Sequence, residues 1–531
     1  APSRGLVESP RDGAVEKGEV VDVVGWALFP AAPTSRVEVR LGDELLGRAR
    51  VGVDRPDLVA LSENPHARVS GFNLSLDLEE HPRLSGDVVL HVSAFSADGR
   101  RHELDPVALS IAGREREPSR SEKLPPLPPV TPRGNERPGR RVLVYTHQLN
   151  LGGAQLYLMD LVRELLAQEA IAPTVVSALD GALREELEEL DVPVHIAGPV
   201  SMNNHGAHLG RLEELEGWCE GREFELVLVN TVTALALPGA ELASRLGVPC
   251  VWAIHESFSL GTVWGYPEPA IRAEAERALA EASAVLFEAE ATRRMFERHL
   301  GEGRGHVLPY GLDLAPVDAE RANFDPAAAR REAGIPEDAE VALCVGTVEP
   351  RKAQLPLAQA FDLIAGRHPR AHLVFVGVGK DDYSELLTDL AERSAYRDRI
   401  HLVPITPHVQ RWYGLSDLLV CASDVESLPR TVLEAMAWET PVLATGVFGL
   451  PELIEDGESG WLCEARDTTA LAEGLERALS APPEERRAIG EASRRLVAER
   501  HSLERYAGAV GTLIGQAVAD SANPAKIDAA K

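Results

Sequence analysis

Two series of short apolar runs, separated by longer amphipathic runs, constrain the fold of this chain more than any other feature. The first series begins at Arg141 and comprises RVLVYTH, APTVVSAL, FELVLVN and PCVWAIHES; the second begins near Ala339 and comprises EVALCVGTV, AHLVFVGVG, RIHLVPI and SDLLVCAS. Strand-like runs that alternate with helical runs predict a mostly parallel sheet covered by helices. Because the rhythm occurs twice, the sequence predicts two doubly wound α/β domains that face one another, at residues 141–312 and 313–495.

A different pattern precedes these two series. Residues 1–112 contain alternating segments such as RVEVRL and FNLSLDL between turn signals, which predicts an all-β sandwich. Trp26 is expected in its core, with stacking on a sugar as the alternative. Residues 113–140 hold seven prolines and little apolar content, which predicts an extended linker. Its Pro-rich centre is either a spacer or a segment that docks into a partner's groove.

Composition excludes several classes of protein. The 531 residues carry a formal net charge of −29, which argues against a nucleic-acid partner. There is no apolar run long enough to span a bilayer, and the start APSRGLVESPRDGAV is unlike a signal peptide. The five cysteines show no metal-like spacing, so we expect reduced thiols and no metal site. We therefore expect a cytoplasmic protein, with peripheral association at the inner face of the cell membrane as a further option.

Two features of the first series are candidates for chemistry. Gly152 and Gly153 follow the strand-like RVLVYT and open a helical run, where backbone N–H groups and the helix dipole favour a phosphate; a tight turn alone is the alternative. His255 ends the strand-like VWAI, where a neutral imidazole could bind a sugar hydroxyl or transfer a proton. Neither motif matches a dinucleotide-binding or P-loop pattern.

The second series places two cations directly after a strand. Arg351 and Lys352 follow EVALCVGTV, and adjacent cations at the carboxyl edge of a sheet suit a diphosphate leaving group. Between residues 141 and 516 the chain uses lysine only at Lys352 and Lys380, so a lysine here indicates a need for a compact point charge. A solvated basic start of a helix is the alternative.

The segment ESLPRTVLE places two carboxylates around a strand-to-helix turn. Glu426 is expected in the turn and Glu434 on the following helix, with the backbone N–H groups near Ser427 and Leu428 pointing at an anion. A diphosphate flanked by a ribose and a sugar would meet both demands. Glycoside hydrolysis by a carboxylate pair is an alternative, which ranks lower because its substrates carry no anion. A carboxylate that only favours the helix N-terminus is another.

These motifs together resemble the GT-B glycosyltransferases of retaining family 4. The resemblance rests on GGAQLYLMDLVREL, IHES, GTVEPRK and SDLLVCASDVESLPRTVLEAMAWETPVLATGVFGLPELIEDGESGWL, and covers residues 141–516. It implies two Rossmann-like domains on either side of a cleft, an acceptor-side domain followed by a donor domain. The stretch at residues 496–516 resembles the terminal helix that crosses back to the first of them, and we expect the tail 517–531 to be disordered.

The resemblance also implies roles for single residues. Glu426 would contact the donor sugar, Glu434 the ribose, and Arg351 with Lys352 the diphosphate. Gly153 would lie against the phosphates or the acceptor, and His255 near the reacting sugar. The chain departs from the family pattern twice: Gly346 is followed by Thr347 where many members have arginine, and Ser427-Leu428-Pro429 replaces a Gly-aromatic-Gly segment. Gly346 is still expected in the donor loop, with Arg351 serving in place of the missing arginine.

The implied activity is transfer of a sugar with retention, from a UDP- or GDP-linked donor to a glycan or lipid-linked acceptor, without a metal or other cofactor. The N-terminal segment looks like immunoglobulin-like accessory domains of bacterial polysaccharide enzymes and would recruit acceptor or mediate assembly. Two other functions stay open at this point. One is a glycan-binding scaffold with an inert GT-B pair, and the other is a sugar-nucleotide epimerase.

Overall fold

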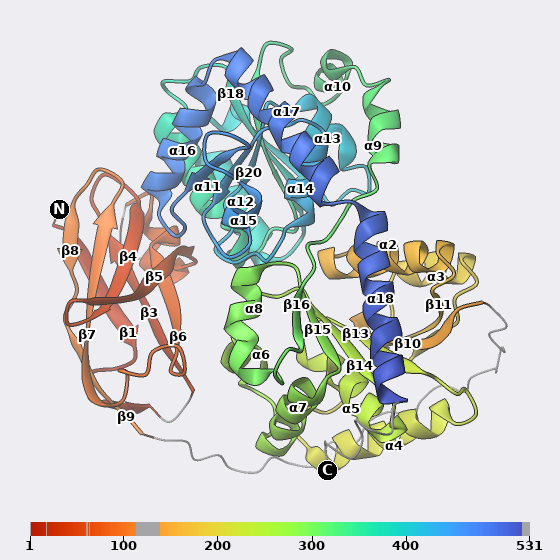
Figure 1. Cartoon of the computed structure of the whole chain (residues 1–531). Coiled ribbons are helices and arrows are strands. Elements are labelled where there is room, and N and C mark those ends of the chain that lie inside the picture. Colours follow the sequence, from red (N-terminus) through yellow and green to blue (C-terminus); the bar gives the residue numbers. More distant parts are fainter. Residues whose placement is uncertain (1, 17–18, 60–61, 63, 113–137, 523–531) are drawn as a thin grey trace. The chain divides into compact units, whose positions relative to one another are not determined.

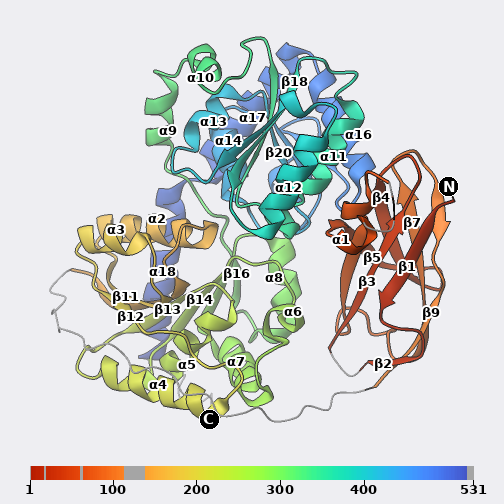
Figure 2. The same cartoon turned by 180° about the vertical axis from the view of Figure 1, so that it is seen from behind.

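The computed structural model describes residues 2–16, 19–59, 62, 64–112 and 138–522 (Figures 1 and 2). Most of the predicted linker and the last part of the predicted tail lie outside these ranges. The chain forms two compact units: the first contains strands β1–β9 and β17–β22, and the second contains β10–β16 and the C-terminal helix α18. Within the described ranges, no helix combines the length and the apolar character that a membrane crossing requires.

The N-terminal domain is strand-rich, as its alternating pattern predicts. Its strands follow the order β1-β3-β6-β5-β4-β7-β9-β2, with β8 added beside β7. Every second residue of β3 and β6 is buried, and Val23, Phe72 and Leu76 belong to one core. Trp26 is only partly buried because it lies on the opposite side of β3 from Val23, so the expectation of a core tryptophan is not met. The elements are β1 (Arg4–Ser9), β2 (Ala14–Glu16), β3 (Val20–Leu28), β4 (Thr34–Leu41), β5 (Glu44–Val53), α1 (Pro56–Val59), β6 (Gly71–Asp77), β7 (Gly86–Ser96), β8 (Arg101–Glu103) and β9 (Val107–Ile111).

The first α/β domain has a parallel sheet in the order β12-β11-β10-β13-β14-β15-β16. The order reverses between β10 and β13, and in doubly wound sheets ligands bind outside the carboxyl ends of strands at such a switch point. The strands are β10 (Arg140–Gln148), β11 (Ile171–Leu179), β12 (Val194–Ile196), β13 (Leu226–Asn230), β14 (Cys250–Ile254), β15 (Ala284–Phe287) and β16 (Gly305–Val307). The helices are α2 (Gly153–Ala167), α3 (Leu183–Glu189), α4 (His205–Cys219), α5 (Leu237–Leu246), α6 (Leu260–Trp264), α7 (Pro269–Glu281) and α8 (Glu290–Phe296).

The second α/β domain repeats this topology with six parallel strands, in the order β19-β18-β17-β20-β21-β22, and its switch point lies between β17 and β20. The strands are β17 (Glu340–Val345), β18 (Ala371–Val378), β19 (Ile400–Pro404), β20 (Leu418–Cys421), β21 (Val442–Thr445) and β22 (Trp461–Cys463). The helices are α9 (Leu314–Arg321), α10 (Pro326–Glu332), α11 (Gln354–Ile364), α12 (Asp382–Arg393), α13 (Gln410–Leu415), α14 (Arg430–Ala437), α15 (Leu450–Leu453), α16 (Thr468–Ser480) and α17 (Pro483–Arg500), with the short 3-10 helix η4 (Pro350–Lys352) before α11.

The C-terminal helix differs from its expected bounds. Helix α18 runs over Leu503–Ser521, and the chain is not helical at residues 501 and 502, so the predicted single helix at 496–516 is wrong at both ends. The break arises because Ser502 caps α18 through its side chain and the His501 imidazole contacts the backbone oxygen of Tyr310. The helix continues to Ser521 because Ala517 extends its buried stripe, so the start of the predicted tail is ordered. Helix α18 packs on α2, within the second unit.

Candidate functional site

Three charged side chains meet beside the switch point of the second α/β domain. Arg351 and Lys352 lie on η4, after β17, and Glu426 lies in the turn between β20 and α14. Lys352 Nζ donates a hydrogen bond of 2.8 Å to Glu426 Oε1, and Arg351 Nη1 donates one of 3.1 Å to the same oxygen. Ser423 Oγ donates a third hydrogen bond, 2.9 Å long, to that atom. The structure thus brings together the predicted cations and the first of the predicted carboxylates.

Burial and charge act against each other in this cluster. The side chains of Glu426 and Lys352 are 10% and 15% exposed. Burial alone would raise the pKa of Glu426, but Lys352 and Arg351 lower it below its ordinary value. Burial likewise opposes the charge of Lys352, and Glu426 more than compensates, so the pKa of Lys352 is raised. All three groups are therefore charged at neutral pH, with a net charge of about +1.

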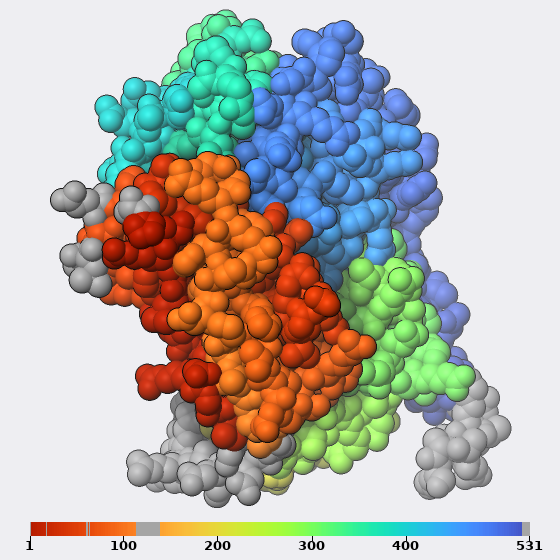
Figure 3. All heavy atoms as spheres, turned by 90° about the vertical axis from the view of Figure 1, so that its left-hand side faces the viewer, coloured from red at the N-terminus to blue at the C-terminus, as the bar shows by residue number. Residues whose placement is uncertain are grey.

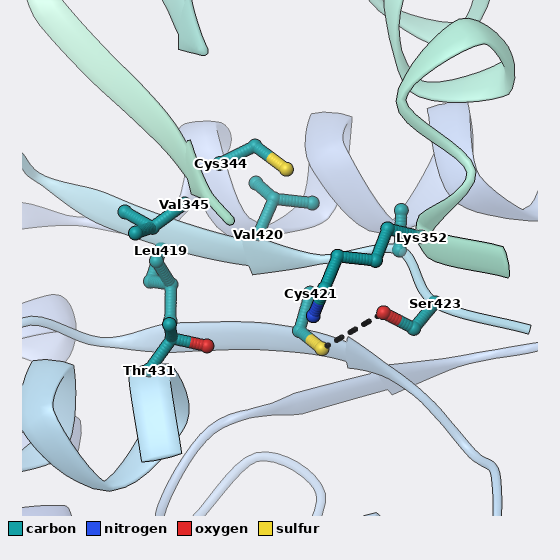
Figure 4. Close-up of a pocket in the computed structure, with 9 residues that line it drawn as sticks. Cys344, Val345, Lys352, Leu419, Val420, Cys421, Ser423 and Thr431 are labelled. Carbon is teal, nitrogen blue, oxygen red and sulfur yellow. Dashed lines mark hydrogen bonds between the residues drawn. The ribbon is translucent and has the colours of Figure 1, made fainter. Parts of the chain in front are cut away.

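Gly346, which the sequence predicts to be in a donor loop, lies next to Lys352. Its φ is +136°, in the range that favours glycine, and a Cβ there would lie 3.1 Å from Lys352 Cε. Figure 4 shows the Lys352 side chain extending to Cys421 and Ser423. The pocket at this point is lined by residues of β17, η4, β20, the turn after β20, and α14: Cys344, Val345, Lys352, Leu419, Val420, Cys421, Ala422, Ser423 and Thr431. The thiols are protonated because burial raises the pKa of Cys344 to about 12 and that of Cys421 to about 11.

Glu434 lies on α14, as predicted, but its carboxylate already has partners. Its Oε2 accepts a hydrogen bond of 2.8 Å from the Tyr413 hydroxyl, and its Oε1 accepts one of 2.7 Å from Arg430 Nε. Sequence reasoning missed both of these partners. The i, i+4 spacing of Arg430 and Glu434 was a visible signal for the second of them.

Ser427 and Leu428 are both buried, and the segment Ser427–Pro429 groups with the second compact unit. The Ser427 hydroxyl lies 3.0 Å from Thr292 Oγ1, which is also bonded to Ser257 Oγ at 2.7 Å. The Ser427 side chain is therefore engaged within a hydroxyl network, and its predicted contact with a donor stays a prediction.

In the second unit, His255 directly follows β14 and both of its ring nitrogens face oxygen atoms. Nδ1 lies 2.9 Å from Glu288 Oε1, and Nε2 lies 2.8 Å from Asn230 Oδ1. The Asn230 amide nitrogen donates to the backbone oxygen of Ala154, which fixes Oδ1 as the atom that faces the ring. Both ring nitrogens of His255 therefore lie within hydrogen-bond distance of oxygen atoms of this unit. The Tyr157 ring packs against His255 with centroids 4.0 Å apart.

His147, a residue that sequence reasoning missed, lies near His255 at the end of β10. Its Nε2 accepts a hydrogen bond from the Gln155 amide at 3.0 Å. Burial and the neighbouring His255 lower the pKa of His147 to about 4, so the ring is neutral at pH 7. The adjoining Thr231 has a φ of +79°, and such strain in a β-branched residue is concentrated at functional sites. In the sequence, His147 and Thr231 stand at the ends of the strand-like segments RVLVYTH and FELVLVNT. That position was the signal that could have identified both residues.

Gly152 and Gly153 lie where the sequence places them, at the start of α2. Gly152 is the extended residue before the helix, and a Cβ there would lie 2.4 Å from Gln155 Oε1, so a larger residue would displace the end of the Gln155 side chain. A Cβ at Gly153 would meet no atom within 4 Å. The packing of this unit does not explain Gly153, which leaves room for a ligand to approach the backbone there.

Among the described residues, one group of side chains has ligand atoms close enough together to hold a metal ion. His208, Glu241 and Glu274 place one such atom each within 4.8 Å of one another. His208 Nε2 lies 2.8 Å from Glu241 Oε2, and Glu274 Oε1 lies 3.0 Å from Nε2 of His205. The group joins helices α4, α5 and α7 to one another, and we assign it that packing role.

Two doubly wound domains, each with charged or polar side chains at the carboxyl ends of its strands, are the architecture of the GT-B glycosyltransferases. Two family models match the chain: the one described as "Glycosyl transferases group 1" at residues 326–496, and the one described as "Glycosyltransferase Family 4" at residues 151–316. Both matches lie after the strand-rich domain.

Curated relatives and solved structures agree with these models. The D-inositol 3-phosphate glycosyltransferase of Streptosporangium roseum is 30% identical over 353 residues, which cover 62% of this chain and 76% of the relative. The protein of the same name from Streptomyces avermitilis is 28% identical over 403 residues, 67% of this chain and 83% of the relative. A glycosyltransferase from Rickettsia africae has a similar structure, with a TM-score of 0.61 at 17% identity, over 71% of this chain and 99% of that one. Anabaena HepE, solved in complex with UDP, has a TM-score of 0.59 at 20% identity, over 71% of this chain and all of that one. The chain therefore belongs to the glycosyltransferases of family 4, and its two α/β domains have the GT-B fold.

Proposed function

We propose that this protein is a retaining glycosyltransferase that moves a hexose from a nucleotide-diphosphate sugar to a glycan or lipid-linked glycan. The observation that carries this proposal is the meeting of Arg351, Lys352 and Glu426 at the carboxyl ends of β17 and β20. Cations at a switch point can neutralise a departing diphosphate, and an adjacent carboxylate can accept hydrogen bonds from sugar hydroxyls.

For the donor, we propose that Lys352 and Arg351 bind the diphosphate, Glu426 the sugar and Glu434 the ribose hydroxyls. The two cations are paired with Glu426, and Arg351 also pairs with Glu349 at 2.7 Å. The diphosphate of a nucleotide sugar would be a further anion for them to bind. The structure of Anabaena HepE in complex with UDP, and a second one with UDP-glucose, favour a UDP-linked sugar over the GDP-linked alternative. Gly346 serves the site by leaving room for the Lys352 side chain.

For the reaction, we propose displacement on one face of the sugar. The bond from the anomeric carbon to the diphosphate oxygen breaks, and the diphosphate leaves with the electron pair. The acceptor hydroxyl forms the new glycosidic bond on the same face, and its proton passes to the departing phosphate oxygen. The chain contributes positioning and charge, because Glu426 is already bonded to Lys352, Arg351 and Ser423 and is poorly placed to act as a covalent nucleophile.

For the acceptor side, we propose that Gly153 and His255, with its neighbours His147 and Glu288, bind the hydroxyl-bearing substrate. The curated relatives are named for D-inositol 3-phosphate, so a phosphorylated polyol is the second acceptor to test beside glycans. We further propose that the strand-rich domain is an immunoglobulin-like sandwich. The buried residues of its strands form one hydrophobic core, which supports this proposal. The setting we propose is the cytoplasm, including the inner face of the cell membrane, in synthesis of a surface polysaccharide or glycoconjugate.

The test is calorimetric binding of UDP, GDP, ADP and dTDP to the wild-type protein and to Glu434→Ala. We expect one nucleotide to bind selectively and Glu434→Ala to weaken it about tenfold, the effect of one charge-assisted hydrogen bond. Glu458→Ala, which removes an exposed carboxylate of the same domain, is the matched control and should bind as the wild type does.

The outcomes separate the proposal from its alternatives. Absence of binding at millimolar nucleotide would overturn the transferase and leave a scaffold with an inert GT-B pair. Conversion of the nucleotide sugar without any acceptor would instead indicate an epimerase. Release of nucleotide that depends on an added glycan or inositol phosphate, with the anomeric configuration kept in the product, would support the proposal in full.

A further inference from the structure

Four arginines of the strand-rich domain form ion pairs with carboxylates of the second α/β domain, which belongs to the same compact unit. These arginines lie on β4, on β5 and just before β6. Figure 3 shows the strand-rich domain, in red and orange, in contact with the blue-coloured residues of the second α/β domain. The pairs are Arg36–Asp467 at 2.7 Å, Arg48–Glu464 at 2.5 Å, Arg50–Asp424 at 2.9 Å and Arg68–Asp389 at 3.0 Å.

Apolar contact accompanies these ion pairs. Val69 of the strand-rich domain is 6% exposed and belongs to the same core cluster as Leu355 and Phe361 of α11. At Gly52, whose φ is +85°, a Cβ would lie 3.6 Å from Leu355 Cβ and 3.7 Å from Pro356 Cδ. The two domains thus share buried surface in addition to charge, which distinguishes this contact from a solvated set of surface ion pairs.

Asp424 is the most deeply buried carboxylate of the contact. Its side chain is 2% exposed and lies between two arginines, Arg50 with Nε at 2.9 Å and Arg466 with Nε at 3.7 Å. Burial raises the pKa of Asp424, and Arg466 and Arg50 oppose that rise. Arg466 also donates to the backbone oxygen of Arg48 at 2.9 Å. A buried carboxylate depends on such partners, so removal of Arg50 leaves this charge with one distant counterion.

The segment that Arg50 holds is part of the proposed donor site. Asp424 lies two residues before Glu426, and its backbone N–H donates to the Arg351 backbone oxygen at 2.7 Å. The preceding Ser423 donates its hydroxyl to Glu426. The turn at residues 422–426 is therefore bonded on one side to η4 and on the other to Arg50, so a shift of Asp424 would displace Glu426 from Lys352.

We propose that Arg50 is a positioning residue of the donor site, and that the strand-rich domain is a fixed support of the turn 422–426 rather than a tethered module that recruits acceptor. The expected effect on donor binding rests on the proposed function, whereas the effect on the turn does not. Arg50 acts through Asp424 and touches neither donor nor acceptor.

The test compares the full-length variants Arg50→Ala and Arg50→Lys with the wild type and with Arg83→Ala. Arg83, in the same domain, is 77% exposed and paired with Glu44, which makes it the matched control. Hydrogen exchange measured by mass spectrometry should show the amides of residues 422–426 exchanging about tenfold faster in Arg50→Ala. Arg50→Lys keeps the charge and should restore most of the protection, and Arg83→Ala should match the wild type.

Nucleotide binding supplies the second measurement. We expect Arg50→Ala to weaken the nucleotide that the wild type binds by about tenfold while leaving the KM for acceptor unchanged. If Arg50→Ala lowers the melting temperature but leaves both exchange at 422–426 and nucleotide affinity as in the wild type, the contact is structural only and the inference is wrong. If the wild type binds no nucleotide, the proposed function fails, and the exchange measurement alone decides whether Arg50 holds the turn. Should Arg50→Ala fail to fold, Arg50→Gln takes its place, because it removes the charge but keeps much of the side chain. Faster exchange of the turn in Arg50→Gln than in the wild type then supports the inference, and equal exchange overturns it.

Discussion

Lys352 Nζ lies 2.8 Å from Glu426 Oε1, and these two residues are separated by 74 positions in the chain. Arg351 donates to the same oxygen, so two cations share one carboxylate atom. A donor diphosphate that binds here would meet charges that are already in place, which reduces the cost of reorganising the site. Because two cations share one carboxylate, we expect substitutions of the carboxylate and of a cation to differ in their effects on stability and on turnover.

Replacing Lys352 with alanine should lower turnover at least about tenfold, because one charge-assisted contact to the leaving diphosphate is lost. The effect on stability should be small, since Glu426 keeps Arg351 as a partner. Steady-state kinetics and urea unfolding measure the two quantities. A variant with unchanged turnover would exclude Lys352 from the site, and Lys380→Ala, the other lysine of these domains, is the control.

Replacing Glu426 with glutamine should be more damaging to the fold than Lys352→Ala. It leaves Arg351 and Lys352 next to one another without their shared carboxylate, and an unpaired buried charge costs about 3–5 kcal/mol. Chemical unfolding at pH 7 would show this as a lower midpoint with an unchanged slope. If Lys352→Ala proves the more destabilising of the two, the assignment of Glu426 as the common counterion is wrong.

Replacing Gly153 with alanine should separate function from folding. No atom lies within 4 Å of the added methyl group, and alanine favours the first turn of α2, so stability should be unchanged or higher by up to about 1 kcal/mol. If a substrate lies against this backbone, as we propose, its KM should rise severalfold. Gly210→Ala, at an equally open position on α4, is the control. It should leave stability unchanged or slightly higher, and it should leave KM unchanged. An unchanged KM for both substrates in Gly153→Ala would remove Gly153 from the site.

Acid should destabilise the protein through histidines that are held neutral. The pKa of His147 is lowered to about 4, mainly by burial, whereas in the unfolded chain it is about 6.5. The unfolded chain therefore binds the proton first as the pH falls, and stability is lost between about pH 6.5 and pH 4. His195 and His372, also with a pKa of about 4, act in the same direction. Thermal unfolding at several pH values should show a smaller loss for His147→Gln than for the wild type. Parallel curves would show that His147 is not held neutral in the fold.

The amino-acid sequence contained the local information for much of this fold. The period of the apolar runs predicted both parallel sheets. The positions of Arg351, Glu426 and His255 after strands placed these residues at the carboxyl ends of the sheets, where we propose the site. The sequence also predicted Glu434 on the helix that follows the turn. These features depend on a few neighbouring residues, whose spacing is visible along the chain.

Tertiary structure decided which side chains are partners. Glu426 meets Lys352 because the strand order places β17 beside β20, and His255 meets Asn230 because β13 lies beside β14. Arg50 and Asp424, 374 positions apart, are paired through the packing of two domains. Local periodicity determines which face of a strand or helix is buried but says nothing about what covers it. Hydrogen bonds and ion pairs between distant residues depend on strand order and domain packing, which come from the free energy of the whole chain rather than from any single segment.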